Sequence, residues 1–282
     1  MQWVLLLNGG FLITEIIGAF LTNSLALLSD ATHIASDIST LIIALIAVRL
    51  GRRPPDAKRT FGYIRVEAIG AMINGIILFA VAGYILWEAA HRFRHPPEIA
   101  ASSILVIAGI GLIVNIIAVY LLRVSSRENL SIKGAYLEAW GDLFSSMAVL
   151  IGTVLILFTG WNIIDSILSI LIGLWMLPRI WALMHEAGNV LMESAPKGID
   201  THEIRAALSA TPGVDSVHDL HIWALSSSQP AIAAHIVVPE HENATQLQGQ
   251  LMELLKTQFG IQHITLQIES SACEGPHCDK SR

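Results

Sequence analysis

Two short segments carry metal-binding side chains at helical spacing. His33 and Asp37 are four residues apart, and so are Glu138 and Asp142. Residues four apart lie on one face of an α-helix, so each pair would point in one direction. Each pair also lies within a long apolar stretch, where an ionisable group is costly unless it has a partner or a function. The spacing therefore predicts a metal site between two helices inside a membrane.

These four side chains suit a tetrahedral zinc site, because Zn²⁺ binds imidazole nitrogen and carboxylate oxygen in that geometry. If the two helices pack antiparallel, His33 lies level with Asp142, and Asp37 with Glu138. Three carboxylates and one neutral imidazole give such a site a formal charge of −3. That charge is prohibitive in hydrocarbon, so protons should occupy the site until a divalent cation displaces them. The pattern therefore indicates exchange of metal for protons.

The same side chains have a structural alternative, which is to form interhelical hydrogen bonds or ion pairs that stabilise a bundle. Asp30, one turn before His33, has three interpretations: an acid at the outer mouth, a partner of a metal ligand, or a helix-end residue. Glu15, Asn74 and Asn115 fit hydrogen-bonding roles within the bundle better than a ligand role.

The composition is that of a polytopic membrane protein with a soluble part attached. Of the 282 residues, 53% are hydrophobic and 14% are charged, whereas a soluble domain carries about 25% charged residues. Six segments reach the roughly 20 apolar residues that span a bilayer: 3–21, 24–48, 68–90, 104–122, 135–158 and 163–184. The first lacks the basic flank and cleavage site of a signal peptide, so we expect a membrane helix with a minimal N-terminal tail.

Basic loops predict the orientation of these spans. The loop 49–65 carries six Lys and Arg residues, and the segment 123–133 carries three. The positive-inside rule places both loops, and with them both termini, in the cytoplasm. Arg92 and Arg94 lie in a loop on the opposite side, but six basic residues outweigh two.

The chain changes character after residue 189. Residues 190–282 hold 5 basic and 11 acidic residues and account for the whole net charge of −6, which excludes nucleic-acid binding through phosphates. Apolar periodicity predicts helices at 200–210 and 246–259 and strands at 214–225, 231–239 and 263–269. The order α-β-β-α-β is sufficient for a small α+β domain. We therefore expect an all-α six-helix transmembrane domain over residues 1–189 and a soluble α+β domain over 190–282.

Three segments resemble one protein family. They are SLALLSDATH at 24–33 followed by Asp37, GAYLEAWGD at 134–142, and HDLHIWAL at 218–225. In this order, with six helices, they resemble the cation diffusion facilitators, in particular their bacterial cobalt–zinc–cadmium resistance branch. The resemblance implies a homodimer in the bacterial inner membrane that exports Zn²⁺, and also Cd²⁺ and Co²⁺, in exchange for protons. It implies a metallochaperone-like, ferredoxin-like fold for the cytoplasmic domain.

The resemblance also implies a regulatory metal site in that domain, at positions like His221, His235, His263 and Glu269, whose occupancy tightens the dimer. The alternative for each histidine is an ordinary half-buried residue. Cys273 and Cys278 offer soft ligands near the C-terminus, or else belong to a loose tail. They form no disulfide framework.

The sequence departs from the family at Glu138, where zinc-transporting members usually have histidine. A carboxylate there makes the site harder and more anionic, which argues against strict zinc selectivity. There is also no His-rich loop between the predicted fourth and fifth helices.

Two other functional classes compete with transport. A membrane-embedded metalloenzyme would need an open coordination position, a water and a general base, but the chain has neither a helical His-Glu-x-x-His motif nor a nucleophile elbow. A metal-sensing membrane protein would bind metal without any flux. We therefore expect a transporter and not an enzyme.

Overall fold

The computed structural model describes residues 2–51, 53–125, 130–226, 229–239 and 243–271. Residues 2–8, 40, 41, 44, 45, 47, 48, 51, 122–125 and 130–138 are described by their backbone alone.

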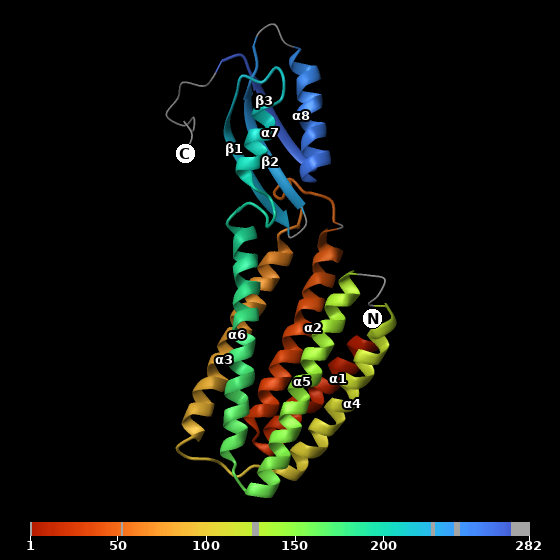
Figure 1. Ribbon diagram of the computed structural model, residues 1–282, viewed down its shortest axis with the longest axis vertical. Helices are drawn as coiled ribbons and strands as arrows, with labels where there is room; N and C mark the ends of the chain where they lie inside the picture. The colour runs from red at the N-terminus through yellow and green to blue at the C-terminus, as the bar shows by residue number, and fades with distance from the viewer. Residues whose placement is uncertain (1, 52, 126–129, 227–228, 240–242, 272–282) are drawn as a thin grey trace. The chain divides into compact units, whose positions relative to one another are not determined.

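Six long helices form the first part of the described chain. They are α1 (Gln2–Thr22), α2 (Leu25–Gly51), α3 (Val66–Arg92), α4 (Ala101–Ser125), α5 (Leu130–Thr159) and α6 (Ile163–Leu191) (Figure 1). Among the described residues, four stretches are long and apolar enough to cross a bilayer: Val66–Arg92, Ala101–Leu121, Ala139–Thr159 and Ile163–Leu191. A shorter apolar helix covers Gly9–Thr22. The helical membrane region is thus confirmed, while the number of six spans stays a prediction.

The outer faces of these helices are apolar, as a lipid environment requires. Phe79 of α3, Ile113 of α4 and Phe158 of α5 are exposed on the surface. Large exposed apolar faces are rare on soluble proteins and mark contact with another apolar phase. Inside the bundle, small residues allow close approach, since Gly111 of α4 faces the ring of Phe11 of α1. A side chain at Gly111 would collide with that ring.

Two further helices and three strands complete the described chain: α7 (Thr201–Ser209), β1 (Ser216–Ser226), β2 (Gln229–Val237), α8 (Ala244–Phe259) and β3 (His263–Glu269). The order α-β-β-α-β is the predicted one. β2 begins earlier than the predicted residue 231 and includes Pro230, which is tolerated near the start of a strand. In the sheet order β1-β2-β3, β1 pairs antiparallel with β2, and β2 pairs parallel with β3.

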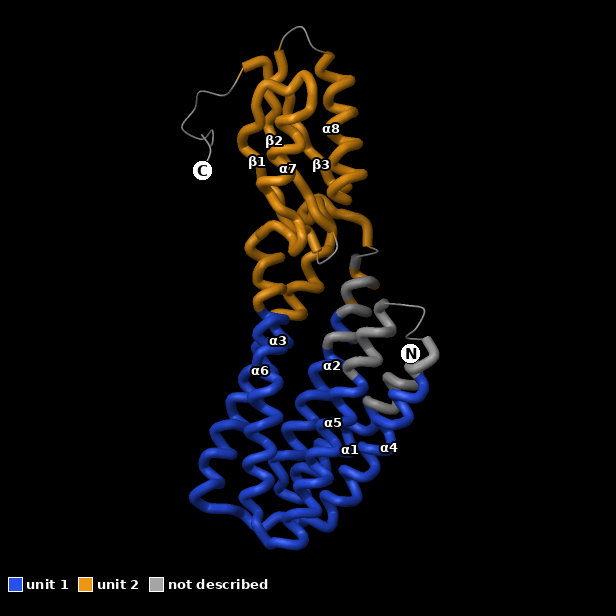
Figure 2. The backbone as a smooth tube through the Cα atoms, viewed as in Figure 1, with its two compact units in different colours: residues 1–45, 73–184 blue, residues 46–72, 185–282 orange. Residues whose placement is uncertain are grey.

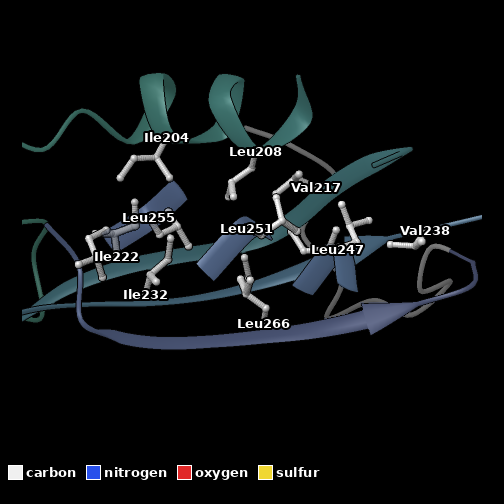
Figure 3. Close-up of a cluster of buried hydrophobic side chains, with 13 residues drawn as sticks. Ile204, Leu208, Val217, Ile222, Ile232, Val238, Leu247, Leu251, Leu255 and Leu266 are labelled. Atoms are coloured by element: carbon white, nitrogen blue, oxygen red, sulfur yellow. The ribbon is translucent and has the colours of Figure 1, made fainter. Parts of the chain in front are cut away.

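The core of this α+β fold lies between the sheet and its two helices. Ile204 and Leu208 point from α7 toward the sheet, and Leu251 and Leu255 from α8 are fully buried with them (Figure 3). Burying a side chain of this size stabilises the fold by about 1.5–3 kcal/mol. The opposite face of the sheet therefore remains available for polar side chains.

The described chain divides into two compact units, which do not follow the sequence boundary between helices and strands (Figure 2). Unit 1 comprises residues 1–45 and 73–184, and unit 2 comprises residues 46–72 and 185–282. Unit 2 therefore contains the end of α2, the start of α3 and the end of α6 together with the sheet. In the loop before α3, the Asp56 carboxylate accepts hydrogen bonds from the backbone N–H groups of Lys58 and Arg59 and from the Tyr63 hydroxyl. These hydrogen bonds hold the pKa of Asp56 below its ordinary value.

Candidate metal centre

The first candidate site lies in unit 1, where α2 and α5 bring three possible ligands together. Ligand atoms of His33, Asp37 and Asp142 all lie within 4.8 Å of one another. His33 Nδ1 is 3.4 Å from Asp37 Oδ2 and 3.7 Å from Asp142 Oδ1. Both carboxylates thus converge on one ring nitrogen, as the antiparallel pairing of His33 with Asp142 requires.

Burial makes this cluster unusual. The His33 side chain is 2% exposed, and the Asp142 side chain is 11% exposed. Within the described part of the chain, Asp142 Oδ1 is buried and has no hydrogen-bond partner. A buried carboxylate oxygen without a hydrogen bond is costly, and a cation is one way to satisfy it. With metal–ligand bonds of about 2.0–2.2 Å, small side-chain movements would let one divalent ion touch all three groups.

Neighbouring helices hold the cluster in position. Asn115 of α4 donates hydrogen bonds to the backbone carbonyl of Asp142, at 3.1 Å, and to Ser146 Oγ, at 2.9 Å. The His33 ring lies against Trp175 of α6, with 5.5 Å between ring centroids. The cluster therefore depends on four helices, although its three ligands come from two.

Sequence reasoning missed Arg179, which reaches the same cluster from α6. Its Nη1 lies 3.1 Å from His33 Nε2, and its Nη2 lies 3.5 Å from Asp37 Oδ1. A signal was present in the sequence, because Arg179 is the one Lys or Arg residue in the predicted span 163–184. A charged residue inside a membrane helix needs a partner and marks a candidate functional site.

The predicted fourth ligand, Glu138, is not placed. Its backbone belongs to α5, one turn before Asp142, but its side chain lies outside the described residues. The expected pairing of Asp37 with Glu138 therefore stays a prediction.

Asp30 does not join the ligand cluster and instead connects α2 to α5. Its carboxylate accepts hydrogen bonds from Ser145 Oγ at 2.5 Å and from Ser146 Oγ at 3.3 Å. Next to it lies Glu15 of α1, which is 1% exposed. The carboxyl groups of Glu15 and Asp30 are close enough to interact with each other. Of the three interpretations of Asp30, the hydrogen bonds favour a supporting role beside the ligands.

The second candidate site lies on the sheet in unit 2, where ligand atoms of His218, His235 and Glu269 lie within 4.8 Å of one another. Glu269 is the centre of the cluster, because its Oε2 lies 3.2 Å from His218 Nε2 and its Oε1 lies 2.8 Å from His235 Nδ1. The strand register explains the convergence. His218 pairs with His235, and Glu269 pairs with Val237, two residues further along β2 and on the same face.

The other predicted cytoplasmic ligands are not part of this cluster. His221 pairs with Ala233, and His263 pairs with Ala231. Both histidines therefore lie on the same face of the sheet as His235, because their partners on β2 are two and four residues from it. However, His263 and Glu269 are at opposite ends of β3, about 20 Å apart at about 3.3 Å per residue. His221 instead contacts Asp219 at 3.0 Å and lines a cavity of about 630 Å³, while His263 lies against Phe61.

His218 is the member absent from the ligand set implied by the family resemblance, although it precedes His221 in the same motif. An irregularity in β1 between these two histidines, with Asp219 at a φ of 50°, decides which of them meets His235. Cys273 and Cys278 lie outside the described residues.

A multi-pass helical membrane protein with a small α+β domain is the class that this architecture defines. Family models agree with both parts: the cation efflux transmembrane domain matches residues 1–192, and the cytoplasmic domain of cation efflux proteins matches residues 196–271. The chain belongs to the cation efflux family. It is therefore a metal cation efflux transporter and not an enzyme.

Characterised relatives match over nearly the whole chain. The metal cation efflux system protein CzcD of Cupriavidus metallidurans is 45% identical over 96% of this chain and 86% of its own length. The zinc transporter ZitB of Escherichia coli is 38% identical over 96% of this chain and 87% of its own length. The cadmium, cobalt and zinc/H(+)-K(+) antiporter of Bacillus subtilis is 37% identical over 93% of this chain and 86% of its own length.

The solved structures that match include the metal-bound C-terminal domain of the CzcD transporter from Cupriavidus metallidurans. It is 39% identical to this chain, covers 25% of this chain and 99% of its own, and superposes with a TM-score of 0.24.

Proposed function

We propose that this chain is a proton-coupled antiporter that exports Zn²⁺, and also Cd²⁺ and Co²⁺, from the cytoplasm. The observation that carries the proposal is the buried convergence of His33, Asp37 and Asp142 on one point between α2 and α5. The names of the relatives mention the three metals, and the antiporter's name gives H⁺ together with K⁺ as the exchanged ions. Glu138 completes the proposed ligand set from the turn of α5 that precedes Asp142.

The donor set also supports the coupling to protons. Carboxylates and imidazole must be deprotonated to bind a metal ion, so metal binding releases protons. A cluster of buried carboxylates that releases its metal must take protons or another cation in return, because isolated negative charge is not stable there. The same residues thus serve both substrates in alternation.

We assign the transport function to residues 1–189 and metal binding and dimerisation to residues 190–282. The cluster of His218, His235 and Glu269 is the proposed regulatory zinc site of residues 190–282. Further candidate ligands in this region are His221, His263, Cys273 and Cys278. The family model for residues 196–271 describes the cytoplasmic domain and supports the homodimer. The basic loops support an inner-membrane protein with both termini in the cytoplasm.

The test is zinc flux into proteoliposomes, with internal pH followed by a fluorescent dye. Asp37→Asn and Asp142→Asn should each reduce flux to the level of protein-free liposomes, because each removes one negatively charged ligand. Glu88→Gln is the matched control, since this carboxylate pairs with Arg92 in α3 and lies outside the cluster. It should transport like the unmodified chain.

Three results would contradict the proposal. Near-normal flux in Asp37→Asn or Asp142→Asn would reject the ligand assignment. Zinc flux without proton movement would reject the coupling. Zinc binding without any flux in the unmodified chain would favour the metal-sensing alternative.

A further inference from the structure

Arg179 holds a permanent positive charge next to two of the proposed metal ligands, His33 and Asp37. The guanidinium donates toward His33 Nε2 at 3.1 Å and forms an ion pair with Asp37 at 3.5 Å. Arg179 is 43% exposed and Asp37 is 24% exposed, so the guanidinium lies at the edge of the cluster and not in its buried centre.

The hydrogen-bonding capacity of arginine assigns the tautomer of His33 in this arrangement. A guanidinium carries donors and no acceptor. His33 Nε2 must therefore accept, and Nδ1 carries the hydrogen, which points toward the carboxylates of Asp37 and Asp142. Both nitrogens of the ring are thus engaged.

A metal ion on His33 is incompatible with this contact, whichever nitrogen it uses. If the metal binds Nε2, it takes the lone pair to which Arg179 donates. If the metal binds Nδ1, the neutral ring carries its hydrogen on Nε2, and two donors then face each other at 3.1 Å. A metal-bound histidine normally gives its second N–H to an acceptor, and arginine offers none.

The geometry points to Arg179 as a tethered cation that competes with the transported metal for His33 and Asp37. This inference rests on the proposed metal site. Arg179 compensates the charge of Asp37 when no metal is bound, leaves when metal arrives, and favours release when it returns. A transport site must bind its ion strongly enough to load it and weakly enough to release it. Arg179 supplies the weakening of binding that release requires.

The test is direct zinc binding to the full-length protein in detergent, measured by calorimetry. The background carries His218→Ala, His221→Ala, His235→Ala, His263→Ala, Cys273→Ser and Cys278→Ser, so that the heat reports the intramembrane site. Arg179→Gln removes the charge and should bind zinc about tenfold more tightly, because a charge-assisted contact no longer opposes the metal. Arg179→Lys keeps the charge but loses the planar fork that spans two partners, and should bind about two- to threefold more tightly.

Flux supplies a second readout that a purely structural role would not produce. Arg179→Gln should lower the half-saturating zinc concentration and also lower the maximal rate, because release becomes slower. Arg94→Gln is the matched control, since it removes the same charge from an exposed loop position. It should change neither quantity.

The outcomes separate this inference from the proposed function. If Asp142→Asn leaves zinc binding unchanged, the proposed site itself is wrong. If Asp142→Asn abolishes binding but Arg179→Gln binds zinc equally or more weakly, the competition is rejected. If Arg179→Gln does not fold, Arg179→Lys decides: tighter binding supports the competition, and unchanged or weaker binding overturns it.

Discussion

Charge at single positions determines what the intramembrane cluster can hold. His33 is the centre of the cluster, because two carboxylates meet at its Nδ1 and one guanidinium at its Nε2. Each of these partners is an ionisable group within 4 Å of the ring, and electrostatic interactions are strong where water is excluded. Exchange of one ligand type should therefore alter which metals bind.

Glu138 is the residue at which ligand type can be tested. We expect Glu138→His to keep zinc transport and to narrow selectivity, with cobalt flux falling most, by at least about fivefold relative to zinc. Imidazole is a softer donor than carboxylate and suits Zn²⁺ well. A site with imidazole at this position should therefore accept fewer kinds of divalent metal ion than the site with carboxylate. The measurement is competition flux of zinc against cobalt and cadmium in proteoliposomes.

A charge change at an exposed position is the control for this selectivity test. Glu98→His makes the same replacement on an exposed loop residue and should leave the zinc-to-cobalt ratio unchanged. An unchanged ratio in an active Glu138→His variant would mean that other residues set selectivity.

Helices must be held at a fixed height for these side chains to meet, and Asp165 of α6 provides one such attachment. Its carboxylate accepts from the Ser24 hydroxyl at 2.5 Å and from the backbone N–H groups of Leu25 and Ala26 at 2.8 and 3.3 Å. These N–H groups belong to the first turn of α2, where an anion is favoured by the helix dipole. His33 follows about 12 Å further along the same helix, at about 1.5 Å per residue.

Loss of this cap should weaken the bundle. Asp165→Ala should lower the free energy of unfolding by about 2–3 kcal/mol, because buried donors lose a charged acceptor. Asp165→Asn should cost less, since one acceptor oxygen remains. Thermal unfolding in detergent is the measurement, and Glu98→Ala, which removes an exposed carboxylate, should stay within about 0.5 kcal/mol. Equal stability of Asp165→Ala and the unmodified chain would show that α2 is anchored elsewhere.

At the scale of the whole transporter, we expect the two candidate sites to have different roles. The intramembrane cluster combines buried ligands with a membrane location, whereas the cluster on the sheet is half-buried and belongs to unit 2. Soluble strands cannot form a path through a bilayer. We therefore expect metal at the sheet to modulate transport without performing it.

Two double variants test this division of roles. His218→Ala with His235→Ala should weaken zinc binding at the sheet at least about tenfold, since even the indirect partners of metal ligands contribute about 10- to 100-fold. Binding is measured in a full-length Asp142→Asn background. In the unmodified background the same pair should shift the zinc dependence of flux without abolishing it.

The matched control exchanges the other two histidines of the same sheet face. His221→Ala with His263→Ala removes two imidazoles that lie outside the cluster, so sheet binding should be retained. The reverse result, with loss of binding only in the second pair, would favour His221 and His263 over His218 and His235 as ligands.

Local patterns in the sequence were sufficient for the type and order of the elements. Apolar stretches of bilayer length predicted the helical membrane region, and period-two and helical patterns predicted the α-β-β-α-β order, because both depend on neighbouring residues. Helix ends were less accurate. α6 continues to Leu191, beyond the predicted end at residue 184, since hydropathy detects the lipid-facing part of a helix and not the helix itself.

The spacing of His33 with Asp37 also determined that these side chains share a face, since four residues make about one helical turn. Tertiary structure alone decided the rest of the candidate sites. Arg179 reaches His33 from a helix 146 residues away in the sequence, and no local pattern encodes such a contact. On the sheet, an irregularity in β1 selects His218 and not His221, because strand register sets which residues are opposite each other. Sequence fixes periodicity within an element, whereas packing between elements fixes which side chains meet.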